Sequence, residues 1–147
     1  MTPEEINSLK ESGKGKDQFT HPDFYNIDDL LTEEHKMVRN SVRDYVKRDL
    51  SPIIEACAEN NYFPTNMVKE LGNAGCFGPQ IPADYGGGGL DYISYGLAMQ
   101  ELERCDSGVR STASVQGSLV MYPIHKFGSE EQKEKLPHDA NSSENND

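Results

Sequence analysis

A loop rich in proline and glycine divides the chain, because neither a helix nor a central strand can form through it. Residues 76–90, CFGPQIPADYGGGGL, hold two prolines and five glycines. Proline lacks the N–H that a helix or a sheet ladder needs, and glycine loses more backbone entropy on ordering than any other residue. Regular structure must therefore form in two separate blocks, one on each side of this loop.

The block before the loop carries clear helix-start signals. Thr32, followed by two glutamates, is typical of an N-cap with acids at the positive end of the helix dipole, and predicts a helix over about 32–49. Ser51 and Pro52 predict a restart as N-cap and first helical residue, giving a short second helix to about residue 60.

Two more helices are predicted beside the loop. Thr65 can cap a third helix that ends at Gly75, where a left-handed residue fits. Beyond the loop, Asp91 can cap a fourth helix over about 92–104. The apolar side chains expected to face inward on this fourth helix are Ile93, Leu97, Ala98 and Leu102.

A long apolar segment follows over residues 107–127, and we expect a break near Pro123. Ser129 and Gln132 form a capping-box pair that opens a last helix, which we expect to stop after about two turns, at Pro137. The core candidates of the long segment are Val109, Ala113, Val115, Leu119, Val120 and Ile124.

These signals predict an all-α fold with about five to six helices. No stretch shows the alternation of a half-buried strand. We place the helical domain at residues 24–137 and expect residues 1–23 and 138–147 to be disordered, because both ends are polar and have few apolar anchors.

The charge balance excludes several classes of partner. The chain has 25 acidic and 14 basic residues, a net charge of −11, which opposes binding to nucleic acid and to anionic membranes. No apolar run approaches the ~18 residues of a membrane span, and the acidic opening lacks the features of a targeting signal. We therefore expect a cytoplasmic protein that binds neither nucleic acid nor membrane.

The residue types that hold metals are scattered. Cys57, Cys76 and Cys105 lie far apart without a C-x-x-C pair, and no histidine stands at ligand spacing from another histidine or a carboxylate. We predict reduced, structural cysteines and no metal site.

One arginine stands out as a candidate binding residue. Arg110, Ser111 and Ser114 lie among small residues of the 107–127 segment, which suits a wall facing a cavity. An arginine in such surroundings forms either a surface ion pair or a contact with an anionic ligand. The hydroxyls are more often bonded to the helix backbone than catalytic, and no residue of the chain is indicated as a catalytic nucleophile.

The glycine run offers a weaker candidate. Gly86–Gly89 could suggest a phosphate-binding loop, but no Lys-Ser/Thr pair follows it and no strand precedes it. A turn is the favoured interpretation.

Four ordered motifs carry a family resemblance. The run from Ile81 to Asp91, IPADYGGGGLD, resembles the P-x-x-Y-G-G-x-G-L/x-D loop of flavin-dependent acyl-CoA dehydrogenases. Residues 127–133, FGSEEQK, match the family's F/Y-G-S/T-E-E-Q-K element. Residues 95–111, YGLAMQELERCDSGVRS, and 114–124, SVQGSLVMYPI, resemble the glutaryl-CoA dehydrogenase branch in particular.

The resemblance implies a function. The chain would be the N-terminal domain that forms one wall of the cleft for acyl-CoA and FAD. In the glutaryl branch, the arginine matching Arg110 recognises the distal carboxylate of the substrate, and the residue matching Ser111 contributes to the same pocket. The complete enzyme would transfer the β-hydride of an acyl-CoA to FAD, with decarboxylation following in this branch.

The resemblance covers about residues 24–137 and then stops. The catalytic glutamate and the residues that grip the flavin have no counterpart, so we expect a truncated, frameshifted or split product that is inactive and binds no FAD alone. Cofactor-binding residues are therefore not identified. The alternatives are a non-catalytic helical interaction module and one half of a split dehydrogenase. We expect self-association, or association with the missing domains.

Overall fold

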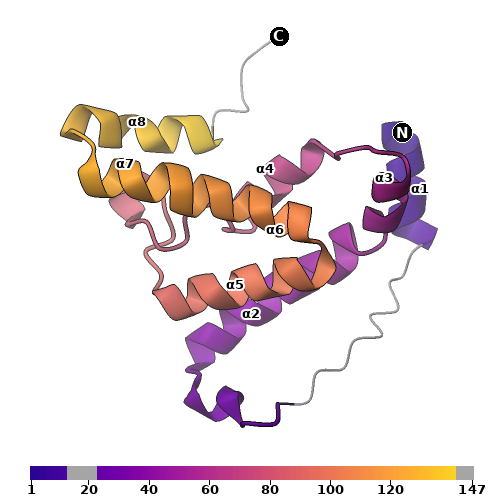
Figure 1. Cartoon of the computed structure of the whole chain (residues 1–147), viewed down its shortest axis with the longest axis horizontal. Helices are drawn as coiled ribbons and strands as arrows, with labels where there is room; N and C mark the ends of the chain where they lie inside the picture. The colour runs from indigo at the N-terminus through magenta and orange to yellow at the C-terminus, as the bar shows by residue number, and fades with distance from the viewer. Residues whose placement is uncertain (13–22, 142–147) are drawn as a thin grey trace.

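The computed structural model describes residues 1–12 and 23–141, and these residues form helices and loops with no strand (Figure 1). The all-α prediction is confirmed. The first block holds α1 (Pro3–Ser12), the 3-10 helix η1 (Ile27–Leu30), α2 (Glu33–Tyr45), the π-helix η2 (Val46–Leu50), α3 (Ile54–Glu59) and α4 (Asn66–Asn73). The second holds the 3-10 helix η3 (Ala83–Tyr85), α5 (Tyr92–Cys105), α6 (Ser107–Ser114), the π-helix η4 (Val115–Met121), α7 (Tyr122–Phe127) and α8 (Glu130–Asn141).

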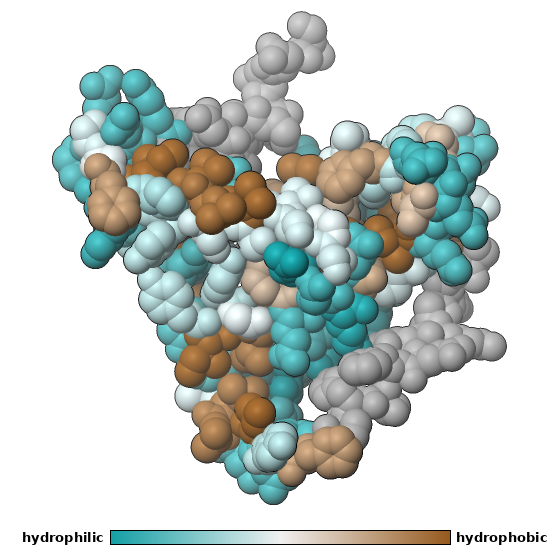
Figure 2. All heavy atoms as spheres, in the orientation of Figure 1, coloured by the Kyte–Doolittle hydropathy of each residue, from teal (hydrophilic) through white to brown (hydrophobic). Residues whose placement is uncertain are grey.

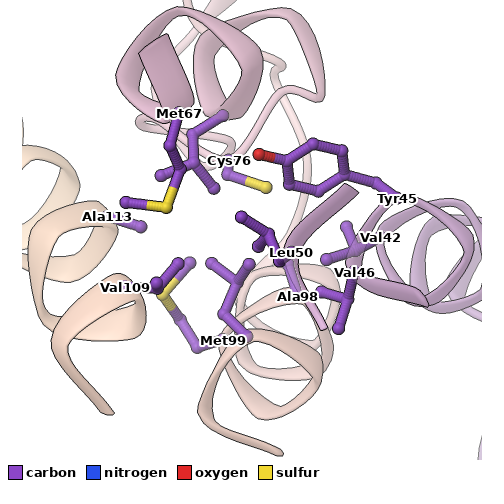
Figure 3. Packing of buried hydrophobic residues seen from close by; sticks show 12 residues of the cluster. Val42, Tyr45, Val46, Leu50, Met67, Cys76, Ala98, Met99, Val109 and Ala113 are labelled. Atoms are coloured by element: carbon purple, nitrogen blue, oxygen red, sulfur yellow. The ribbon is translucent and has the colours of Figure 1, made fainter. Parts of the chain in front are cut away.

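The core lies between the two blocks. Helix α2 packs along α5, and α6 packs on α5 from the other side. The π-helix η2 and the helix α4 close this core (Figure 3). The fully buried side chains between these elements include Leu50, Met67, Leu71, Leu102, Val109 and Ala113.

The predicted caps of α2 and α5 are confirmed, and one histidine joins them. The Thr32 hydroxyl accepts from the His35 N–H at 3.2 Å, and the Asp91 carboxylate accepts from the Ser94 N–H at 2.8 Å. His35 Nδ1 in turn accepts from the Thr32 N–H, so its Nε2 carries the proton that bonds Asp91 at 2.7 Å. The starts of the two central helices are therefore bonded to each other.

The helix break predicted at Ser51 is shifted. Ser51 stays in the helical region at φ −54° and ψ −35°, whereas an N-cap residue is usually extended. Its N–H bonds the Val46 carbonyl across the π-turn, and α3 begins only at Ile54, after the cap residue Ile53. The π-turn carries the chain to Pro52, and the helix restarts at Ile54 rather than at Ser51.

The loop behaves as its glycines predicted. Gly75 has φ +70° directly after α4, which is the left-handed conformation expected there. Gly86 and Gly89 also have positive φ, at 76° and 61°, and turn the chain toward α5.

The second block is more continuous than predicted. Residues 107–127 run through α6, η4 and α7 without a break at Pro123, because the missing proline N–H falls where the π-turn passes into α7. The bonds of the Ser129–Gln132 capping box are present, but α8 continues past Pro137 to Asn141. Four expected core residues are exposed instead: Ile93, Val115, Leu119 and Val120.

The start of the chain also differs from the expected tail. Residues 3–12 form α1, whose Ile6 is buried against Ile53 and Cys57. These partners lie far along the chain, so local composition gave no sign of them. The rest of the predicted N-terminal tail, residues 13–22, and residues 142–147 lie outside the described residues. Within the described residues, no helix is long and apolar enough to cross a membrane.

Candidate binding wall on the second block

A period of four residues organises the segment from α6 to η4. Its fully buried positions recur every fourth residue, at Val109, Ala113, Gly117 and Met121. An α-helix has 3.6 residues per turn and a π-turn has more, so a helix that joins the two keeps one stripe facing the core. The neighbouring rows, each made of every fourth residue, therefore also run along the helix axis. One row is polar and the next is apolar.

The first row beside the buried stripe is polar and half-buried. Arg110 Nη1 donates to Ser114 Oγ at 3.2 Å. Further along, the hydroxyl of Ser118 is hydrogen-bonded to that of Tyr95 on α5, and the Tyr122 hydroxyl is bonded to Tyr92, which raises the pKa of Tyr92. The row consists of Arg110, Ser114, Ser118 and Tyr122.

The next row is apolar and open to solvent. Val115 is 46% exposed and Leu119 is 69% exposed. Figure 2 shows apolar surface along η4 and α7, and a second apolar area near η1. On the second block, the polar row that begins with the cation of Arg110 therefore runs beside an exposed apolar row.

Arg110 is held in place by a neighbouring acid. Glu103 Oε2 accepts from Arg110 Nε at 2.5 Å, and this bond, helped by one from the Ser107 hydroxyl, holds the pKa of the Glu103 carboxyl below its usual range. Both partners are partly exposed. Nη1 bonds Ser114, and among the side chains described in residues 1–12 and 23–135 none bonds the remaining Nη2 group. One amino group of the guanidinium is thus open to a further acceptor.

The structure brings the predicted site residues together in one helix turn. The Ser114 hydroxyl donates to the Ser111 carbonyl at 3.2 Å, and Thr112 donates to the Gly108 carbonyl at 3.0 Å, so these hydroxyls are satisfied by the backbone as predicted. The sequence analysis missed Glu103, Ser118, Tyr122 and Tyr95. The four-residue spacing of Val, Ala, Gly and Met was the signal that could have aligned Ser118 and Tyr122 with Arg110.

The glycine run does not form a phosphate cradle. The amides of Gly86, Gly87 and Gly89 donate to carbonyls of Ala83, Pro82 and Ile81, within the loop itself. A side chain at Gly87 would stand 2.1 Å from the Ile81 carbonyl oxygen, so this glycine serves close backbone packing. The prediction of a turn is confirmed.

The cysteines show the features of core residues. Cys57, Cys76 and Cys105 are free, and burial raises the pKa of all three thiols, that of Cys76 to about 12. Thiols with raised pKa are poor nucleophiles at neutral pH. In the described part of the chain, no group of three potential metal ligands comes together.

A separate cavity lies beside α5, and Glu103 is among the residues that line it. It measures about 850 Å³ and is lined by α2, α5 and the segment around η1. Its charges are already matched: Arg39 forms two bonds with Asp28, and Arg43 forms two with Glu101. In these two pairs, each arginine already makes two bonds to a carboxylate. Arg110, by contrast, keeps one amino group open to a ligand.

Comparison with known proteins gives a consistent result. The family model "Acyl-CoA dehydrogenase, N-terminal domain" matches residues 32–143. The mitochondrial short-chain specific acyl-CoA dehydrogenase of Rattus norvegicus is 37% identical over 105 residues, which is 71% of this chain and 26% of the relative. An acyl-CoA dehydrogenase of Bacillus subtilis is 38% identical over 105 residues, 71% of this chain and 28% of the relative.

Solved structures agree with this match. A glutaryl-CoA dehydrogenase of Mycobacterium smegmatis in complex with FADH2 superposes with a TM-score of 0.75 at 43% identity, covering 79% of this chain and 30% of that one. The butyryl-CoA dehydrogenase of Megasphaera elsdenii gives 0.70 at 32% identity, covering 75% and 30%. The chain spans about a quarter of the length of the curated relatives it matches.

Proposed function

Because this chain belongs to the acyl-CoA dehydrogenase family, as its N-terminal domain, we propose that it forms the acyl-chain wall of a glutaryl-CoA-type dehydrogenase. The reaction of the whole protein would be α,β-dehydrogenation of a dicarboxylyl thioester, followed by decarboxylation. The substrate would be an acyl-CoA with a carboxylate at the far end of its acyl chain.

The observation that carries this proposal is a cation at the start of the row that runs beside the apolar row. Val115 and Leu119 offer apolar contact to the methylene groups of an acyl chain, and Arg110 stands where such a chain would end. Removing a carboxylate from water is costly unless it meets a charged donor, so a plain acyl chain gains nothing from Arg110 whereas a dicarboxylyl chain does. Selection for the longer, charged substrate follows from this contrast.

The contacts of Arg110 suit that role. Glu103 binds Nε and Ser114 binds Nη1, which fixes the plane of the guanidinium and leaves Nη2 for a substrate oxygen. Arginine presents its donors in a rigid fork, so fixing one edge of the group also fixes the other. In this proposal Glu103 is a positioning residue, and Arg110, Ser111 and Ser114 contact the substrate.

The described residues do not fit a flavin by themselves. The amides of the glycine loop donate inward, and the start of α5 is capped by Asp91, whose negative charge disfavours a phosphate there. In complete family members FAD accepts the hydride, but we derive no step through it from this chain. We expect the purified chain to be colourless, and a flavin absorbance band at near-unit stoichiometry would contradict this.

A chimera tests the specificity. Residues 1–136 would be joined to the remaining domains of the M. smegmatis enzyme, and kcat/KM measured for glutaryl-CoA and butyryl-CoA. Arg110→Met keeps most of the volume and removes the charge, so the value for glutaryl-CoA should fall by roughly 10- to 150-fold while that for butyryl-CoA holds.

Arg48→Met is the matched control. Arg48 is 72% exposed at its side chain and pairs with the adjacent Asp49, so its loss should leave the ratio of the two specificity constants unchanged. If Arg110→Met lowers both constants equally, Arg110 is a structural ion-pair residue and the glutaryl proposal fails.

A further inference from the structure

The π-helix η4 sets the alignment of the proposed wall. In an uninterrupted α-helix each residue turns by about 100°, so Leu119, nine residues after Arg110, would stand about half a turn away from it. With the observed period of four, the same nine residues bring Leu119 to within about a quarter turn of Arg110. The wide turn is therefore what places the apolar row beside the cation.

A π-turn is rare, and it occurs mostly as a single-turn bulge inside an α-helix, frequently at a functional site. Two side chains contact the middle of η4 from outside. Gln80 Nε2 donates to the Gly117 carbonyl at 3.4 Å, and this carbonyl also accepts the Tyr122 N–H of the π-turn. The Tyr95 hydroxyl bonds Ser118, the next residue.

On its inner side the π-turn lies close to the backbone of the loop. A side chain at Gly117 would stand 3.1 Å from the Gly78 nitrogen and 3.9 Å from the Tyr95 ring. The helix therefore rests directly on the loop at Gly78, with Gln80 on the same loop and Tyr95 on α5 binding adjacent residues of the turn. Three separate segments of the chain meet at Gly117 and Ser118.

We propose that Tyr95 and Gln80 are specificity-determining positioning residues that hold the π-turn of η4 and thereby align Leu119 with Arg110. The effect on substrate specificity rests on the proposed function. The structural part, that Tyr95 and Gln80 hold the π-turn, does not. Neither residue touches the substrate in this account. Each acts through the register of the helix that carries the wall.

The structural part is tested on the full 147-residue chain by amide hydrogen exchange and backbone chemical shifts. Tyr95→Phe removes one hydroxyl and keeps the ring, and Gln80→Met removes the amide and keeps the length. Each variant should raise the exchange rate of the Tyr122 amide by about 2- to 10-fold relative to amides of α2, because one neutral hydrogen bond is lost locally. Shift changes should concentrate in residues 115–122.

Tyr92→Phe is the matched control, because Tyr92 lies on the same helix and bonds Tyr122 at the edge of the π-turn rather than Ser118 in its middle. It should leave the shifts of residues 115–119 unchanged, and this control is read at those residues because Tyr122 itself loses a side-chain bond. The structural part is overturned if Tyr95→Phe raises exchange equally in η4 and α2, or if Tyr92→Phe changes the shifts of residues 115–119 to the same extent.

The specificity part is tested in the chimera described above. Tyr95→Phe should lower the ratio of kcat/KM for glutaryl-CoA over butyryl-CoA by about 3-fold or more, since a lost neutral hydrogen bond is worth a few-fold change. Flavin content should stay at that of the unmodified chimera. An unchanged ratio in Tyr95→Phe, in a chimera where Arg110→Met does change it, overturns the inference and leaves the proposed function standing. A ratio unmoved by Arg110→Met overturns the proposed function, and the exchange result then decides the structural part alone.

Discussion

Helix α5 carries two glutamates, two residues apart, that meet their arginines in opposite settings. Glu101 is 2% exposed and binds Arg43 on α2 through both carboxylate oxygens, at 2.7 and 3.1 Å, with Arg104 at 3.2 Å. Glu103 is partly exposed and binds a single arginine, Arg110, together with the Ser107 hydroxyl. The first pair joins the two central helices, and the second holds one arginine beside open surface.

The apolar side chains divide in the same way. Leu102, between the two glutamates, is fully buried in the α2–α5 core, whereas Leu119 is 69% exposed on η4. Around Glu101 and Leu102, charge and apolar area are both matched within the chain. On the wall that begins at Arg110 neither is fully matched, and this difference is what separates a structural cluster from a candidate binding surface.

The largest effect expected from this comparison is on the buried glutamate. Glu101→Gln leaves Arg43 and Arg104 without their shared carboxylate in a buried setting, and the free energy of unfolding should fall by about 3–5 kcal/mol. Urea unfolding followed by circular dichroism measures this. Glu103→Gln is the matched control and should leave the midpoint within replicate scatter, because that pair is open to water. Equal shifts for the two variants would erase the distinction between the regions.

The helical core could be predicted because its signals are local. Thr32, Asp91 and the Ser129–Gln132 pair bond amides within three residues, so a cap can be found from the sequence around it. The packing of α1 could not be predicted in this way, because Ile6 is buried by Ile53 and Cys57 from a distant segment.

The wall was predicted only in part. Arg110, Ser111 and Ser114 were proposed because a cation among small residues is unusual, but Leu119 was assigned to the core on hydropathy alone. Hydropathy does not say whether a chain supplies its own cover for an apolar residue. The register that exposes Leu119 depends on a π-turn held by Gln80 and Tyr95, and no short sequence window contains these contacts.

A second prediction uses the exposed row. Isolated domains with a contiguous apolar surface tend to associate, so we expect the chain to self-associate through η4. Leu119→Asp should weaken this association by roughly 10-fold or more, the effect of losing one buried leucine contact. Sedimentation velocity over a concentration series measures it. Met37→Asp is the control, since Met37 is 66% exposed on α2 and away from this row. A chain that stays monomeric at every concentration would contradict the prediction.

The smallest effect concerns the junction between the two starts of the central helices, where Asp91 is itself half-exposed. The bonds from the Ser94 N–H and from His35 lower the pKa of Asp91 to about 2. Because the pKa in the folded chain lies below that of the unfolded chain, about 3.9, the carboxylate stabilises the fold above about pH 4 and this contribution is lost as the pH falls from 4 toward 2.

Asp91→Asn keeps an oxygen that can cap Ser94 but does not titrate, so its stability should change less steeply across this window than that of the unmodified chain. Urea midpoints at pH 4, 3 and 2 give the two slopes, with Asp84→Asn on the neighbouring loop as the control that should keep the steeper one. Equal slopes for Asp91→Asn and the unmodified chain would mean that the junction contributes no pH-dependent stability. The stabilising charge pairs between α2 and α5 would then be those of Glu101 and would not include His35 and Asp91.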